Sequence, residues 1–120
     1  MSLLIIPVID LLDGLVVHAR GGRRAEYAPV QSPLCPSAEP EKVVAALLAL
    51  HPFCEIYIAD LGALLGRDRH DATVARLQAG FPRITFWLDC GGKEPGSNGP
   101  GLRPIKIGRA SCRERVYVLV

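Results

Sequence analysis

The sequence lacks any apolar run near the roughly 20 residues that a membrane-spanning helix requires. Its first apolar segment, residues 3–9, has no basic residue ahead of it and is followed directly by an aspartate, unlike a secretory signal. We therefore expect a cytoplasmic protein that has no membrane partner.

Cysteine and histidine patterns typical of metal sites are also missing. The four cysteines are Cys35, Cys54, Cys90 and Cys112. They form no Cys-x-x-Cys pair, and no histidine lies at the spacing of a zinc site from them. Because cytosolic thiols usually stay reduced, the sequence predicts buried free thiols and no metal. His51 and His70 have no ligand-like partners and are predicted to lie at the surface.

The chain has no net charge when the C-terminal tail, residues 107–120, is left out. The chain has 14 basic and 12 acidic residues, of which three arginines and one glutamate lie in residues 107–120. The other residues therefore hold eleven of each sign, and no basic surface favours a nucleic-acid partner.

The C-terminal tail resembles the translation of an adapter DNA. The DNA string ATCGGAAGAGCGTCGTGTAGGGAAAGAGTG encodes residues 107–116 in order, and it is similar to a standard sequencing adapter. We therefore expect residues 106–120 to be a non-native tail, with a natural basic tail as the alternative. The expected fold is accordingly confined to a single domain over residues 1–105.

Residues 1–105 have the composition of a globular domain, since the chain is 49% hydrophobic and 22% charged. Three nearly continuous apolar runs predict strands that are buried on both faces, as in a parallel sheet: residues 3–9, 56–59 and 84–88. Apolar residues spaced by three and four predict a helix over residues 40–50. Asp71 is expected to cap a second helix, which ends near Gly80.

The segments that connect the predicted strands and helices also have recognisable sequence patterns. Asp13-Gly14 lies between two apolar runs, and this dipeptide favours a tight hairpin because both residues tolerate positive φ. Residues 18–35 are polar and interrupted by glycine and proline, so they predict a long loop. The segment through Gly62 and Gly66 is also predicted to be a loop.

Each predicted strand ends in an aspartate, at Asp10, Asp60 and Asp89. Strands that alternate with helices indicate an α/β fold built from βαβ units, in which the strands run parallel. Their carboxyl ends therefore meet at one edge, where closed barrels and open α/β sheets carry their active sites. An aspartate here can also cap the next segment, but a hairpin follows Asp10. We predict that Asp10 is catalytic and that Asp60 and Asp89 contact the substrate, with capping as the alternative.

Two glycine pairs are candidate phosphate-binding turns. Gly91-Gly92 precedes Lys93, so backbone N–H groups and a cation would face a bound phosphate. A second candidate lies in the long loop, at Arg20, Gly21 and Gly22. The alternatives are a plain tight turn at the first pair and solvated arginines around the second.

The segment Ile-Pro-Val-Ile-Asp10-Leu-Leu-Asp13-Gly14-x-Val-Val resembles the opening of the phosphoribosylformimino-5-aminoimidazole carboxamide ribotide isomerase of histidine biosynthesis and of its sister cyclase. It looks closer to the isomerase. The resemblance continues in Asp60-Leu-Gly-Ala-x-x-Gly66 and in Asp89-Cys-Gly-Gly92, and it covers residues 3–93.

The resemblance implies a TIM (β/α)8 barrel that catalyses an Amadori aldose–ketose isomerisation of a bis-phosphorylated ribotide without a cofactor. In that family the aspartate matching Asp10 is one of two general acid/base groups, and the other is an aspartate on the fifth strand. The chain would then hold about three βα units of the barrel. Such an N-terminal fragment would end before strand five and would be inactive alone.

Three departures from the family pattern leave the substrate open. Arg20-Gly-Gly-Arg-Arg24 stands where the family usually has a Gln-Gly-Asp element. The second aspartate of the usual Asp-Leu-Asp-Gly-Ala is missing after Asp60, and Asp89-Cys-Gly-Gly-Lys93 replaces a Gly-Gly-Gly-Ile-Arg turn. A related barrel enzyme on another phosphosugar and a non-catalytic phosphosugar-binding paralogue are the alternatives.

The adapter-like tail leads to a direct prediction. Sequencing the locus from an independent genomic clone is expected to give a different protein sequence after about residue 105, because genomic DNA would contain no adapter. Recovery of residues 107–116 from that clone would contradict the prediction.

Overall fold

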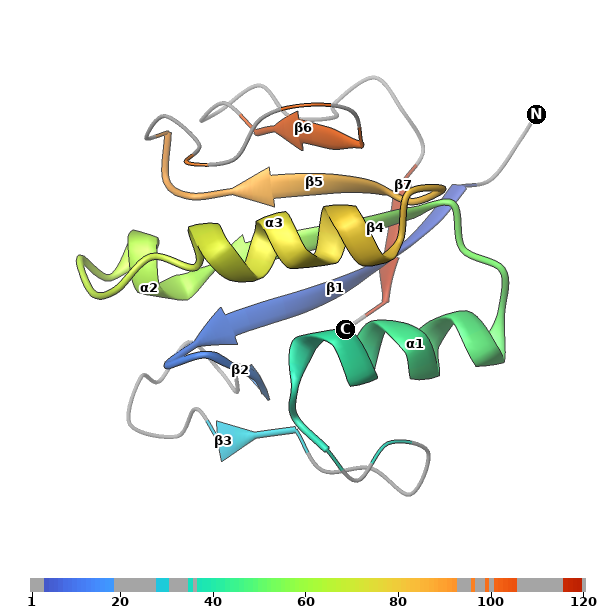
Figure 1. The fold of residues 1–120 in the computed structure, drawn as a ribbon, viewed down its shortest axis with the longest axis horizontal. Helices are drawn as coiled ribbons and strands as arrows, with labels where there is room; N and C mark the ends of the chain where they lie inside the picture. Colours follow the sequence, from blue (N-terminus) through green and yellow to red (C-terminus); the bar gives the residue numbers. More distant parts are fainter. Residues whose placement is uncertain are drawn as a thin grey trace.

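The computed structural model describes residues 4–18, 28–30, 35, 37–92, 96, 99, 101–105 and 116–119. Its strands are β1 (Leu4–Leu12), β2 (Leu15–His18), β3 (Ala28–Pro29), β4 (Glu55–Asp60), β5 (Thr85–Asp89), β6 (Leu102–Pro104) and β7 (Val116–Leu119). They form one mixed sheet of order β3-β2-β1-β4-β5-β6, and β7 pairs with β1 (Figure 1). The chain therefore has an α/β fold.

The predicted parallel arrangement of the three aspartate-ended strands is confirmed. β1 pairs with β4, and β4 with β5, in parallel. β1 extends beyond the predicted strand to Leu12 because its last residues pair antiparallel with β2. Asp13 and Gly14, with φ of 53° and 80°, form the predicted hairpin turn between them. Within the predicted long loop, β3 adds a short antiparallel partner to β2.

Three helices lie in the described part of the chain: α1 (Pro40–Leu50), α2 (Leu61–Leu64) and α3 (Asp71–Gly80). α1 matches its predicted bounds, whereas α2 occupies a segment that was expected to be a loop. The prediction that Asp71 caps α3 was wrong. Asp71 is the first helical residue, and its carboxylate accepts hydrogen bonds from Arg69 at 3.1 and 3.2 Å instead.

The core lies between one face of the sheet and the helices α1 and α3. Phe86 and Ile58 of the strands and Val44 and Leu77 of the helices are fully buried there. Side chains alternate along each strand, so their neighbours point to the opposite face. On β5, for example, Phe86 is buried while Trp87 is only half-buried. Burial on both faces is found along β1, as expected, because Ile6 and Leu12 are buried on the face opposite Ile9 and Leu11. It is not found along β5, whose residues on that second face are only half-buried.

The predicted thiols differ in their surroundings. Cys90 is buried in the core and Cys35 is half-buried, both as free cysteines. Cys54 is also free but exposed, which contradicts the prediction of burial, because it lies in the turn before β4. Cys112 lies outside the described residues.

β7 belongs to the segment that was predicted to be a non-native tail. Its residues Val116–Leu119 pair in parallel with the first half of β1, from Leu4 to Pro7. The pairing does not bear on the coding origin of the tail, which stays a prediction. Within the described residues, no helix has both the length and the apolar character needed to cross a membrane.

Candidate active site at the carboxyl edge of the sheet

A row of residues crosses the three parallel strands near their carboxyl ends. Asp10 is the register partner of Ala59, and Ala59 is the register partner of Asp89. Register partners on parallel strands point to the same face, so both carboxylates lie on the face opposite the buried core. Asp60 pairs instead with the fully buried Leu11 and therefore points to the core face. The three aspartates reach one edge, as predicted, but they divide between its two faces.

Tyr57 joins this row from the middle strand. It stands two residues before Ala59 and thus on the same face, and its phenol donates a hydrogen bond to Asp89 Oδ2 at 2.7 Å. Asp89 Oδ1 accepts a second bond from the Gly91 backbone N–H at 3.1 Å. Asp89 is therefore oriented by a donor from the neighbouring strand and by one from the turn that follows it. Sequence reasoning missed Tyr57, although strand alternation from Ala59 would have placed it here.

Burial and neighbouring charges shift the pKa values of two groups in this row, Asp10 and Tyr57. Burial raises the pKa of Asp10, and the nearby His18 on β2 partly offsets this increase. The pKa of Tyr57 is raised by burial, by its hydrogen bond to Asp89 and by the charges of Asp89 and Asp10, so the phenol remains a donor. A partly buried carboxyl group with a raised pKa is suited to act as a general acid or base.

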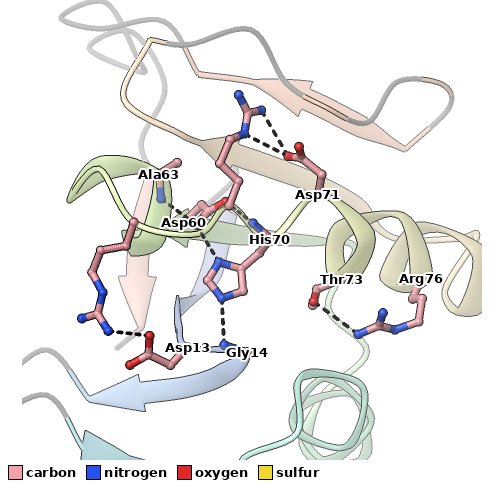
Figure 2. Close-up of polar contacts among 10 residues, drawn as sticks. Asp13, Gly14, Asp60, Ala63, His70, Asp71, Thr73 and Arg76 are labelled. Atoms are coloured by element: carbon pink, nitrogen blue, oxygen red, sulfur yellow. Dashed lines mark hydrogen bonds and ion pairs between the residues drawn. The ribbon is translucent and has the colours of Figure 1, made fainter.

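Asp60 is 1% exposed and bonds entirely within the protein. Its carboxylate accepts hydrogen bonds from the Ala63 N–H at 3.1 Å and from the His70 N–H at 2.8 Å. The His70 ring approaches it as well, with Nδ1 at 2.7 Å from Asp60 Oδ1 (Figure 2). The carboxylate thus caps α2 and joins β4 to the start of α3, which agrees with the capping alternative.

The prediction that His70 lies at the surface was wrong, whereas His51 is exposed as expected. His70 is 6% exposed, and both of its ring nitrogens have partners. Nδ1 contacts Asp60, and Nε2 accepts a hydrogen bond from the Gly14 N–H at 3.0 Å (Figure 2). Such bonds allow a polar ring to be buried. No local pattern revealed them, because Gly14 lies 56 residues away in sequence.

The hydrogen bonds also set the ionisation of Asp60. Burial alone would raise the pKa of this carboxyl group, but the bonds from His70 and Ala63 outweigh burial and lower it. The ionised form is therefore the one that the folded protein stabilises.

The glycine turn after β5 has a clear conformational requirement. Gly91 and Gly92 have φ of 74° and 78°, a region that other residues rarely adopt. A Cβ at Gly91 would also approach Leu64 to 2.9 Å. These features agree with a tight turn and leave its predicted role in phosphate binding open. Lys93, together with the other predicted anion site at Arg20, Gly21 and Gly22, lies outside the described residues.

The same face bears further polar contacts away from the carboxyl edge. Trp87 Nε1 donates to Glu55 Oε1 at 2.9 Å, and the Arg103 guanidinium lies 5.0 Å from the Trp87 ring centroid. Among the described residues, no three histidine, cysteine, aspartate or glutamate side chains gather as metal ligands would. The groups present on this face are carboxyl groups, a phenol, an indole and a guanidinium.

Comparison with known proteins adds a partial relative. No protein-family model matches the sequence. The chain is 45% identical over 62 residues to an uncharacterized protein of Methanocaldococcus jannaschii. The matched segment covers 52% of this chain and 27% of that protein. The chain thus spans well under half of the relative's length.

The buried Asp60 leads to a prediction about acid stability. Because its pKa is lowered in the folded state, its stabilising effect is complete above the unfolded pKa of about 3.9 and is lost as the pH falls through the lower folded value. Asp60→Asn should remove this dependence and lower the free energy of unfolding at pH 7 by about 2–3 kcal/mol.

Urea unfolding from pH 7 to pH 3 measures both effects. Asp68→Asn is the matched control, because this aspartate is exposed in the same connection between β4 and α3. Equal stability losses in the two variants at pH 7 would contradict the prediction.

Proposed function

We propose that this chain forms the first βα units of a TIM (β/α)8 barrel whose activity is an aldose–ketose isomerisation of the histidine-biosynthesis type. The substrate would be a small bis-phosphorylated ribotide, and the reaction would proceed in the cytosol without a cofactor. The observation that carries the proposal is the position of Asp10. It lies on the face opposite α1 and α3, at the carboxyl edge, in one register row with Asp89.

The architecture supports a barrel in two ways. The strands β1, β4, β5 and β6 are successive parallel neighbours, which is the arrangement of a barrel wall. Both α1 and α3 pack on one face, as the outer helices of a barrel do, while the other face carries polar side chains. In a closed barrel that second face would be the interior, and its carboxyl end would be the active site.

The chemistry suits the groups in the row. An Amadori rearrangement begins when an acid protonates the ring oxygen and the sugar opens to an imine. A base then removes the proton from C2, and C1 gains a proton as the enol becomes the ketone. Asp10, whose pKa is raised, would serve as one of these acid/base groups. The second group would come from the fifth strand, as the family resemblance implies.

The remaining groups would hold the substrate. Asp89, fixed by Tyr57 and Gly91, would accept hydrogen bonds from the sugar hydroxyls. Gly91, Gly92 and Lys93 would bind one phosphate, and the segment Arg20–Gly22 the other. Asp60 would support this wall from the core face through α2 rather than through direct contact.

A related barrel enzyme acting on another phosphosugar is the second candidate. The basic segment Arg20-Gly-Gly-Arg-Arg24 favours it, because it replaces an element expected in the isomerase. Assays of the protein from its complete gene with the histidine-pathway ribotide and with a panel of other phosphosugars separate the two. Binding of these compounds without turnover of any of them would favour a non-catalytic paralogue instead.

The proposal predicts that the 120-residue chain alone does not turn over the ribotide. The described strands supply Asp10 but neither the second acid/base group nor the rest of the barrel wall, so the substrate would not be held in a reactive geometry. A coupled assay with purified chain tests this, and turnover above that of a heat-inactivated sample would refute it.

The role of Asp10 is tested in the protein from the complete gene. Asp10→Asn keeps the size of the side chain but removes its titratable proton, so kcat should fall by about 10²–10⁴-fold. The melting temperature should change little. The assay uses the histidine-pathway ribotide, with both quantities measured on one preparation.

Asp13→Asn is the matched control, because Asp13 is an exposed turn residue and asparagine tolerates its positive φ. It should keep normal turnover. A lower melting temperature with normal turnover per folded Asp10→Asn molecule would assign Asp10 a structural role and remove the main support for the proposed isomerase.

A further inference from the structure

The side chain of Tyr57 crosses from its own strand toward the carboxyl edge of the next one. Its register partner on β5 is Trp87, whereas Asp89 is the partner of Ala59, two residues further along β4. The phenol therefore runs diagonally to donate to Asp89 Oδ2 at 2.7 Å. Ala59 follows Tyr57 on the same face and has only a methyl group, which leaves room for this crossing. The hydroxyl of Tyr57 thus lies beside the row of carboxylates.

The carboxylate of Asp89 is held from two sides but keeps part of its accepting capacity. Oδ2 accepts from the Tyr57 phenol, and Oδ1 accepts from the Gly91 N–H at 3.1 Å. A carboxylate has about four lone-pair sites, divided between its two oxygens. Contacts among the described residues therefore leave about one site on each oxygen. Because Asp89 is only half-buried, a ligand can reach these sites.

Two acceptor sites on one carboxylate suit two adjacent hydroxyl groups of a sugar. Each hydroxyl can donate to one of the oxygens, and an acidic side chain recognises a ribose hydroxyl in dinucleotide-binding folds. A phosphate group would instead be repelled by the negative charge of the carboxylate. The chemistry of Asp89 therefore favours the hydroxyl-bearing part of a sugar phosphate.

The bond from Tyr57 decides which way the remaining sites of Asp89 face. The last torsion of an aspartate side chain has a broad energy minimum, so a single bond from Gly91 would leave the carboxylate free to turn. The phenol fixes the second oxygen. It also keeps its proton, because burial, the bond to Asp89 and the charges of Asp89 and Asp10 raise the pKa of Tyr57.

We propose that Tyr57 is a positioning residue, which orients Asp89 to bind two adjacent hydroxyl groups of a sugar and so makes the site prefer ribose to deoxyribose compounds. The inference rests on the proposed function for the class of ligand, a sugar phosphate. Its test is a comparison of binding affinities, which requires no turnover.

Binding is measured by calorimetry in the protein from the complete gene, with ribose 5-phosphate and 2-deoxyribose 5-phosphate as probes. The wild type should bind the ribose compound at least about tenfold more tightly, because a hydrogen bond to a charged group contributes this much. Tyr57→Phe removes only the phenol oxygen and should reduce the ratio of the two affinities to below about threefold. Asp89→Asn should do the same, because one of the two accepting oxygens is replaced by a donor.

Trp87→Phe is the matched control. Trp87 Nε1 donates to Glu55 Oε1 at 2.9 Å, which is also a bond between β5 and β4 on this face but lies further from the carboxyl edge. The control should lower the melting temperature and keep the wild-type ratio of affinities. Loss of stability alone cannot change this ratio, since unfolded molecules reduce the binding of both probes equally.

Three results would overturn the inference. They are equal or undetectable binding of the two probes by the wild type, an unchanged ratio in folded Tyr57→Phe, and an equal loss of the ratio in Trp87→Phe. The last would show a general effect of the pairing between β4 and β5. Lack of turnover of the histidine-pathway ribotide, with a ratio that is high in the wild type and reduced in Tyr57→Phe, would overturn the proposed function but support the role of Tyr57.

Discussion

Parallel pairing of β1 with β4 and of β4 with β5 places residues of equal register side by side, and the alternation of side chains then separates two environments. Ile9, Ile58 and Leu88 form one row of the core against the helices. One residue further along, Asp10, Ala59 and Asp89 form a row on the opposite face. A shift of one residue in any pairing would exchange these environments, which would expose apolar side chains and bury carboxylates. The position of the site and the stability of the core thus depend on the same register.

The core face tolerates one charged group because its hydrogen bonds are complete. A buried carboxylate without partners would lose its hydration at a large cost in free energy. Asp60 has three protein donors, two backbone N–H groups and the His70 ring, and these compensate for the lost water. These contacts join β4 to α2 and to the start of α3, and the bond from the Gly14 N–H to His70 Nε2 adds the β1–β2 hairpin. Polar contacts therefore hold these elements together at the carboxyl edge, as apolar packing holds strands and helices together in the middle of the sheet.

Much of the fold followed from local sequence signals. The apolar runs located β1, β4 and β5, the Asp13-Gly14 dipeptide located the hairpin, and spacing located α1. The parallel order of β1, β4 and β5 followed from the alternation of strands and helices. The face of each aspartate did not follow, because it depends on register across strands. His70 was missed because its partner Gly14 lies 56 residues away. Strand alternation could have placed Tyr57 on its face, but its bond to Asp89, 32 residues away, depends on register. At Asp71 the local pattern was misleading. The residue type suits a helix cap, but its carboxylate accepts hydrogen bonds from the neighbouring Arg69 instead.

The division of β1 between partners has a further consequence. Its second half pairs with β2 and β4, whereas its first half pairs with β7 at the far end of the chain. If residues 116–119 were replaced or removed, the backbone groups of Leu4–Pro7 that bond to them would need another partner. Unpaired strand edges are templates for association with other chains, and Pro7 blocks only one donor along this stretch. A version of the chain without these residues would then associate more strongly as its concentration rises, through edge-to-edge contacts of β1.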